Sequence, residues 1–192
     1  VEDLRCPSAD ASMLEAVRIV GDKLKAIDET TIHSTEIPEE FADAYDNHVT
    51  LVCSELAISQ AEIFAEYGDR YPPKLREFYL RGQEVSDERR RECLERRIHF
   101  HDLLDSMLDD FDVLLTPSAP GAALKGLAVT GDPRMNLIAT HTRVPALTLP
   151  AQLDSAGLPL GVQLLGRTGE DMALLATGAL VESASGFDTR AV

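Results

Sequence analysis

A small cluster of histidines and aspartates is the most metal-like group in the sequence. His99, His101, Asp102 and Asp105 fall in a segment whose pattern predicts a helix. In a helix, residues i and i+2 point about 200° apart, so the two histidines do not converge on one ion. His101 and Asp105 share a face, but two ligands do not complete a zinc site. The spacing therefore predicts no bound metal.

The sequence also lacks the motifs that usually hold an activated nucleophile or bind a phosphate group. The sequence contains no G-x-S-x-G turn, no phosphate-binding G-x-x-x-x-G-K-[ST] loop and no G-x-G-x-x-G fingerprint. Lysine is scarce, and Lys23, Lys25, Lys74 and Lys125 all lie outside any motif. The sequence therefore predicts no catalytic residue.

The three cysteines do not suggest a metal or disulfide framework either. Cys6, Cys53 and Cys93 are widely spaced and form no C-x-x-C pair. No apolar run approaches the roughly 20 residues that cross a bilayer, and no signal-peptide pattern opens the chain. These features predict reduced thiols and a cytoplasmic location. The first residue is Val1, which favours a processed chain or one cut from a longer protein.

The charge of the chain excludes two classes of partner. Its 192 residues include 18 basic and 33 acidic side chains, a net charge of −15. Nucleic acids and anionic membranes both require Lys and Arg to neutralise phosphate, so neither is expected as a partner. The arginine-rich stretch 84–97 also holds five acidic residues, which is typical of a solvated helix face laced with ion pairs.

Hydrophobic periodicity predicts an α/β fold, with helices first and strands later. Helices are expected over 13–27, 39–67, 74–81 and 86–110. In the second of these, the predicted buried stripe comprises Phe41, Tyr45, Val49, Val52, Leu56 and Ile63. Gly82 is interpreted as a helix stop and Ser86 as an N-cap.

The remaining elements follow from local composition. A β-branched run predicts a strand at 30–37, and an apolar run predicts another at 112–118. A loop at 119–132 and a short helix at 133–142 come next. Residues 144–153 and 158–166 predict a hairpin. A last helix begins after Thr168 and is expected to turn Met172, Leu175 and Ala179 inward.

The strongest signal is a set of three segments in a fixed order. They read FDVLLTPSAP at 111–120, TGDPRMN at 130–136 and VPALTLPAQLDSAGLPLGVQLLGR at 144–167. This set resembles the C-terminal part of the amidase signature family, and Pro38, Phe41, Glu55, Gly82, Val85 and Ser86 fit the same pattern upstream. The resemblance implies a mixed β-sheet flanked by helices, with a helical excursion over about 38–110. It also implies that 1–192 form a single partial amidase domain, with strands, a loop and the final helix over 111–192.

The same resemblance implies an activity that this chain does not complete. Family members hydrolyse carboxamides through an acyl-serine, using a Ser-Ser-Lys set and a Gly/Ser-rich loop in their N-terminal half. No counterpart of that set occurs in these 192 residues. The chain alone is therefore expected to be inactive and to supply scaffold and part of the substrate pocket, with no metal or organic cofactor.

By position, the resemblance nominates five side chains as pocket candidates: Thr116, Ser118, Asn136, His141 and Thr142. Structural roles compete with this interpretation. Thr116 and Ser118 suit turns beside proline, Asn136 suits a helix cap, and His141 suits a hydrogen-bonded core position.

Two alternative functions stay open. The chain is either part of a larger amidase or a free-standing, non-catalytic remnant that binds a separate N-terminal half or a second copy of itself. The second hypothesis rests on the unpaired edge that a cut sheet would expose. Within the first, a glutaminase-like subunit of a tRNA-dependent amidotransferase is the other candidate.

Overall fold

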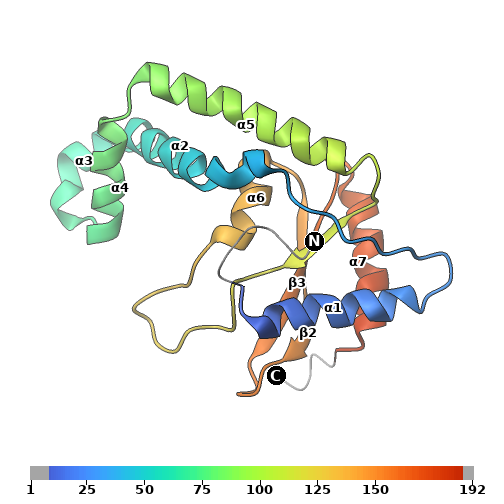
Figure 1. The fold of residues 1–192 in the computed structure, drawn as a ribbon. Helices are drawn as coiled ribbons and strands as arrows, with labels where there is room; N and C mark the ends of the chain where they lie inside the picture. Colours follow the sequence, from blue (N-terminus) through green and yellow to red (C-terminus); the bar gives the residue numbers. More distant parts are fainter. Residues whose placement is uncertain (1–8, 188–192) are drawn as a thin grey trace. The chain divides into compact units, whose positions relative to one another are not determined.

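The computed structural model describes residues 9–187 and divides the chain into two compact units. One unit comprises residues 40–102. The other combines residues 1–39 with 103–192. The first of these units interrupts the second along the sequence, because the second takes residues from both sides of it (Figure 1).

The strand-containing unit is built on a three-stranded antiparallel sheet in the order β1-β3-β2. Its strands are β1 (Leu114–Pro117), β2 (Ala146–Leu153) and β3 (Pro159–Leu165), and its helices are α1 (Ala11–Lys25), α6 (Arg134–Thr142) and α7 (Asp171–Ser185). The expected hairpin is confirmed: the Asp154 N–H donates to the Leu158 carbonyl across the turn. Strands and helices together confirm the α/β class, and the described ladders are all antiparallel.

The core of this unit lies on one face of the sheet. Leu160, Val162 and Leu164 alternate along β3 and pack against α1 and α7. Their partners from the two helices include Met13, Val17, Val20, Leu174 and Val181. Alternate residues of a strand point to opposite faces, so Gly161, Gln163 and Leu165 face the other way, toward α6. The sheet therefore has one apolar face and one more polar face.

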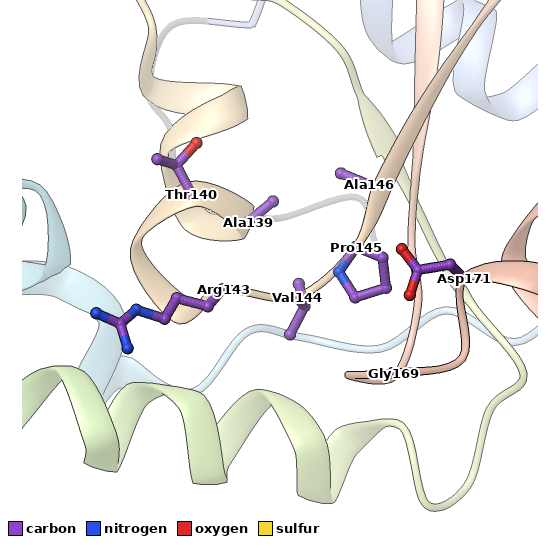
Figure 2. A pocket seen from close by; sticks show the side chains of 8 residues that line it. All are labelled: Ala139, Thr140, Arg143, Val144, Pro145, Ala146, Gly169 and Asp171. Atoms are coloured by element: carbon purple, nitrogen blue, oxygen red, sulfur yellow. The ribbon is translucent and has the colours of Figure 1, made fainter.

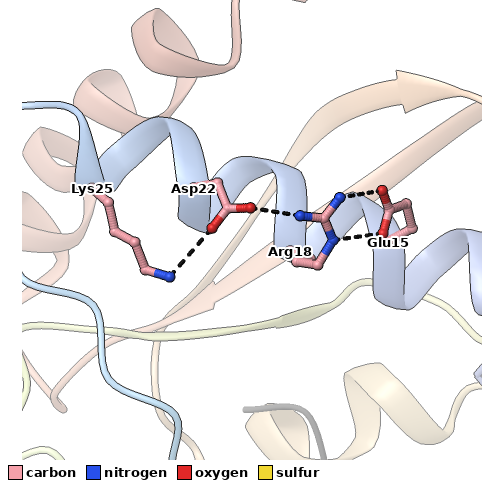
Figure 3. Close-up of polar contacts among 4 residues, drawn as sticks. All are labelled: Glu15, Arg18, Asp22 and Lys25. Atoms are coloured by element: carbon pink, nitrogen blue, oxygen red, sulfur yellow. Dashed lines mark hydrogen bonds and ion pairs between the residues drawn. The ribbon is translucent and has the colours of Figure 1, made fainter.

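The exposed side of α1 carries a chain of ion pairs at helical spacing (Figure 3). The Arg18 guanidinium donates to Glu15 at 2.7 Å and to Asp22 at 2.6 Å, and Lys25 lies 3.2 Å from Asp22. Pairs at i,i+3 and i,i+4 on a solvated helix contribute only a few tenths of a kcal/mol each. These ion pairs are therefore a feature of the solvent-exposed surface of α1.

Residues 40–102 form a helical unit. It contains most of η1 (Glu39–Asp43), then α2 (Ala44–Ser59), α3 (Ala61–Tyr67), η2 (Gly68–Arg70), α4 (Pro73–Gln83) and the larger part of α5 (Asp87–Met107). Ser86 caps α5 as predicted, because its hydroxyl accepts the Arg89 N–H at 3.1 Å. Within residues 9–187, no helix is both long and apolar enough to cross a bilayer.

The prediction of a single helix over 39–67 is wrong in two respects. The chain breaks at Gln60, where φ is −107°, so that α2 and α3 are separate. The buried stripe was also misplaced, because Tyr45, Val52 and Ile63 are exposed. The buried face instead carries Ala44, Asn47, Leu51, Cys53, Ser54 and Ala57.

The sequence interpreted Gly82 as a helix stop, and α4 ends one residue later, at Gln83. Gly82 itself is helical and is buried against α2. A Cβ built at Gly82 would overlap the backbone carbonyl of Cys53 and lie 2.9 Å from the Ala57 side chain. Glycine is therefore used here for close approach of two helices, a role that composition alone does not distinguish from a helix stop.

Two further expectations are corrected. Residues 30–37 form no strand, and only Glu36 makes an isolated bridge. β-branched residues favour a strand only where a partner strand and a packed face are present. In α7, Met172 is 77% exposed and Leu175 51%, whereas Leu174, Gly178, Val181 and Ser185 are buried.

Arg167 joins the end of β3 to the end of α5. Its Nη2 donates to the Leu108 carbonyl at 2.7 Å and to Asp109 at 2.9 Å, while Nη1 lies 3.4 Å from Asp105. The hydrogen bond to Asp109 raises the pKa of Arg167, which keeps the guanidinium charged.

We expect Arg167→Lys to lower the free energy of unfolding measurably, because an ammonium cannot reproduce the forked contacts. Urea denaturation measures the change. Arg89→Lys is the matched control, since Arg89 makes one exposed ion pair to Glu92 and its replacement should change little. Equal losses in both variants would contradict a special role for Arg167.

Candidate functional site

A polar row crosses the face of the sheet that turns toward α6. The register places Thr116 of β1 opposite Gln163 of β3, and Gln163 opposite Thr148 of β2. Thr116 and Gln163 are fully buried, and the Gln163 Nε2 donates to the Met135 carbonyl at 3.2 Å. This bond ties the first turn of α6 to the centre of the sheet.

The structure brings the five candidate residues to this side of the unit, on two elements. Thr116 lies in β1 and Ser118 directly after it; Asn136, His141 and Thr142 lie on α6. Gly161 makes room for Ser118, because a Cβ at Gly161 would lie 2.6 Å from the Ser118 Oγ. The expected close backbone approach at Gly161 is therefore present.

Burial divides these candidates into two groups. Thr116, His141 and Thr142 are buried, and the Thr142 hydroxyl donates to the Ile138 carbonyl at 2.7 Å. Asn136 is exposed and Ser118 is half-buried. Ser118 and Asn136 are therefore accessible at the surface of this unit, whereas Thr116, His141 and Thr142 are enclosed in it.

A surface trough of about 360 Å³ lies beside the C-terminal end of α6 (Figure 2). Its walls are Ala139 and Thr140 on one side and Asp171, at the start of α7, on the other; Pro145 and Ala146 lie between them. Thr140 and Arg143 flank the buried His141 and Thr142. The trough is thus the accessible cavity adjoining the predicted pocket residues.

Arg143, at the rim of this trough, has a strained backbone. It terminates α6 in the left-handed region, with φ 64° and ψ 27°. A non-glycine residue there costs roughly 1 kcal/mol or more. Figure 2 shows its guanidinium extending away from Pro145 and Asp171.

We expect Arg143→Gly to raise the free energy of unfolding by about 1 kcal/mol, because glycine adopts this conformation without a Cβ clash. Thermal or urea unfolding of the purified chain measures it. Arg143→Ala removes the same side chain and keeps the clash, so it should give no gain. A gain with alanine equal to that with glycine would attribute the effect to the side chain and contradict the backbone explanation.

The cysteines in the described part of the chain are poor nucleophiles. Cys53 and Cys93 are free and buried, and burial raises the pKa of both thiols. A raised pKa reduces the thiolate, which is the reactive form. Cys6 lies outside the described residues.

Among residues 9–187, no three His, Cys, Asp or Glu side chains lie close enough together to hold a metal ion. This holds for His99, His101, Asp102 and Asp105 as well.

Sequence reasoning missed Gln163, Arg143 and the trough. Gln163 had a usable signal, since it is a single polar residue inside the apolar strand GVQLLG. A buried amide requires a hydrogen-bond partner, which α6 supplies. The positive φ of Arg143 had no signal, because arginine is not a residue type that favours this region.

An antiparallel sheet with helices on both faces defines this unit as part of an α/β protein. The chain belongs to the Amidase family, whose model matches residues 2–175.

Curated relatives share sequence with a large part of this chain. A glutamyl-tRNA(Gln) amidotransferase subunit from Gluconobacter oxydans is 35% identical over 120 residues, covering 59% of this chain and 22% of the relative. The putative amidase AmiD of Mycobacterium tuberculosis is 30% identical over 148 residues, covering 71% of this chain and 31% of AmiD. The matched segments thus span less than a third of either relative.

Solved structures share the fold. A crystal structure of an amidase superposes with a TM-score of 0.79 at 24% identity, covering 92% of this chain and 42% of that one. A fatty acid amide hydrolase gives a TM-score of 0.79 at 18% identity, covering 98% of this chain and 39% of that one. The whole arrangement described above therefore corresponds to well under half of an amidase-fold protein.

Proposed function

We propose that this chain is the C-terminal part of an amide hydrolase of the amidase signature type. In the complete enzyme, a carboxamide is cleaved to an acid and ammonia or an amine through an acyl-serine, with catalytic groups outside these 192 residues. One observation carries the proposal: a family match over residues 2–175 combined with coverage of only about two fifths of the solved neighbour.

In this proposal the chain contributes structure and one wall of the substrate pocket. The exposed Thr148 and the half-buried Ser118, beside the buried Thr116 and Gln163, offer hydroxyl groups that accept or donate hydrogen bonds. Such groups orient an amide; alone, they do not supply the nucleophile, base and oxyanion donors that acyl transfer requires. The single partial domain over 1–192 and the cytoplasmic location belong to the same proposal.

The first experiment is the intact mass of the natural gene product, purified from its own cells in the assembly that the cells contain. The proposal expects a polypeptide well above 21.0 kDa, or a 21.0 kDa chain bound to a separate catalytic part. A 21.0 kDa product with no amidase partner would overturn the proposal and favour the non-catalytic remnant.

Activity of the isolated chain gives an independent prediction. We expect the purified 192-residue chain to hydrolyse a panel of aliphatic and aromatic carboxamides no faster than buffer, and the natural assembly to hydrolyse at least one. A serine-directed inhibitor applied to both samples identifies contaminating hydrolases. Specific turnover by the isolated chain that survives this control would contradict the assignment.

A component of an amidotransferase is a second candidate within the same chemistry. It is favoured by two relatives that are named as glutamyl-tRNA(Gln) amidotransferase subunits, at 35% and 38% identity. The two candidates differ in what consumes the ammonia. Glutamine hydrolysis that depends on glutamyl-tRNA(Gln) would support the amidotransferase, whereas tRNA-independent hydrolysis of simple amides would support a free amidase.

A further inference from the structure

α3 is a helix that the described part of the chain does not bury. None of its seven residues, Ala61–Tyr67, is buried within residues 9–187. Phe64 attaches α3 to α4, because its ring stacks on the Tyr79 ring at 3.7 Å and meets the Tyr71 ring edge-on at 5.2 Å. A helix this short depends on packing for its stability. The faces of α3 that turn away from Phe64 are therefore available to a partner.

Apolar side chains occupy one of those faces. Ile63 and Tyr67 are four residues apart, so they lie on the same side of α3, and both are exposed. Ile58 on α2 and Leu75 and Leu80 on α4 are exposed as well. A single exposed apolar side chain needs no explanation, but five within residues 58–80 indicate an interaction surface.

Residues 58–81 also have the composition of a protein–protein interface. They hold five of the ten aromatic residues of the chain: Phe64, Tyr67, Tyr71, Phe78 and Tyr79. Arg70, Lys74 and Arg76 each place their charged group over one of these rings, 5.2–5.8 Å from its centroid. Aromatic residues and arginine are the types enriched at the centre of interfaces. The surface of this segment is therefore suited to binding another protein chain.

The charges of this segment divide between its two halves. Residues 61–69 hold three acidic residues and no basic one, whereas residues 70–81 hold four basic residues and one acidic. Asp69 pairs with Arg76 at 3.1 Å, and the other charged side chains of 61–81 make no ion pair within residues 9–187. The segment is thus neutral in a chain of net charge −15, with its acidic side chains on α3 and most of its basic ones on α4.

We propose that this surface binds the same surface of a second copy across a two-fold axis, with α3 of each copy against α4 of the other. We call it the α3–α4 face, and its central residues are Glu62, Ile63, Glu66, Tyr67, Lys74 and Arg81. The inference goes beyond the proposed function and does not depend on it.

Charge complementarity selects a second copy as the occupant. The surface used in a two-fold pair must be complementary to itself. An acidic α3 that meets a basic α4 satisfies this requirement twice, because the axis repeats each contact. The neutrality of residues 58–81 also limits the repulsion that would oppose pairing elsewhere on the surface of an acidic chain.

The first test measures the mass of the natural assembly by light scattering, and the assembly should contain two copies of this chain. Ile63→Glu places a charge in the α3–α4 face and should weaken pairing at least about 10-fold. Ile98→Glu is the matched control, because Ile98 is also an exposed isoleucine, on α5, and lies outside the face. Both positions are exposed, so both variants should keep the fold, which circular dichroism checks.

A mixing experiment tests the pairing of α3 with α4 without any apolar substitution. One variant of the natural product carries Glu62→Lys with Glu66→Lys, so both of its helices are basic. The other carries Lys74→Glu with Arg81→Glu, so both are acidic. Each variant alone should pair at least about 10-fold more weakly than the natural sequence, because like charges face each other. A mixture of the two should associate, since each contact then joins opposite charges.

The outcomes separate the inference from the proposed function. A natural assembly with one copy of this chain overturns the inference, and slow amide exchange at Ile63 and Tyr67 in it would assign the face to another part of that assembly. Equal effects of Ile63→Glu and Ile98→Glu overturn the choice of face. A mixture that associates no better than its components overturns the α3–α4 arrangement. Amide hydrolysis is measured in the same samples, and its absence would contradict the proposed function alone.

Discussion

Gly82→Ala is expected to lower the free energy of unfolding by about 3 kcal/mol, although alanine is the better helix former. On helix propensity alone, the substitution would raise stability by about 1 kcal/mol. Gly82 lies inside α4, however, and an added Cβ would overlap the Cys53 carbonyl of α2 and press on Ala57. Backbone atoms of a packed helix cannot step aside as a side chain can, so α2 and α4 must separate.

Gly178→Ala is the matched control for this prediction. Gly178 is also buried inside a helix, α7, but its added Cβ would meet only the far end of the Leu147 side chain. A leucine can change rotamer at small cost. We therefore expect a loss below about 1 kcal/mol at Gly178. Equal losses at the two glycines, measured by urea denaturation, would contradict the backbone-clash explanation.

These two glycines also show why sequence patterns located the helices better than their buried faces. The apolar period correctly placed a helix after Thr168, but it turned Met172 and Leu175 inward, and both are exposed. The buried face comprises Leu174, Gly178, Val181 and Ser185, so a glycine and a serine occupy two of its four positions. Gly178 is buried because Leu147 of β2 packs over it. That contact depends on tertiary structure, which the helical period does not contain.

The strands were more predictable than the helix faces. The run LLTP and the hairpin around Asp154 combine apolar stretches with proline and turn residues, and each of these cues is local. The strand expected at 30–37 failed because its β-branched residues find no ladder beyond Glu36. Residue types predict a strand both at β1 and at 30–37. The prediction is confirmed at β1, which pairs with β3, and wrong at 30–37, which forms no ladder.

The candidate residues came from the family resemblance, which nominated Thr116, Ser118, Asn136, His141 and Thr142 by position. The hydrogen bond from Gln163 to the Met135 carbonyl brings β3 and α6 together. The accessible trough was not predictable, because its walls come from α6, the turn before β2 and the start of α7. Only the fold makes these segments neighbours. Whether the five residues contact substrate stays a prediction.

Asn47→Leu is expected to raise the free energy of unfolding by about 2 kcal/mol, which reverses the usual sign for a core substitution. Asn47 lies on the buried face of α2 with 2% of its surface exposed. Within the described residues, neither its Oδ1 nor its Nδ2 has a hydrogen-bond partner. A buried polar group without a partner loses its hydration and gains nothing in exchange. Leucine has a similar shape and removes both unsatisfied atoms.

Two comparisons isolate this effect from helix propensity. Asn136→Leu makes the same chemical change at an exposed position of α6, so it reports propensity without burial and should gain at most a few tenths of a kcal/mol. Asn47→Asp keeps the shape but buries a charge, so it should be strongly destabilising at neutral pH and less so in acid, where the carboxyl is protonated. Urea denaturation at two pH values measures all three. A loss of stability in Asn47→Leu would mean that the Asn47 amide is satisfied in solution, and that its hydrogen bonds contribute more than the apolar contacts that leucine would add.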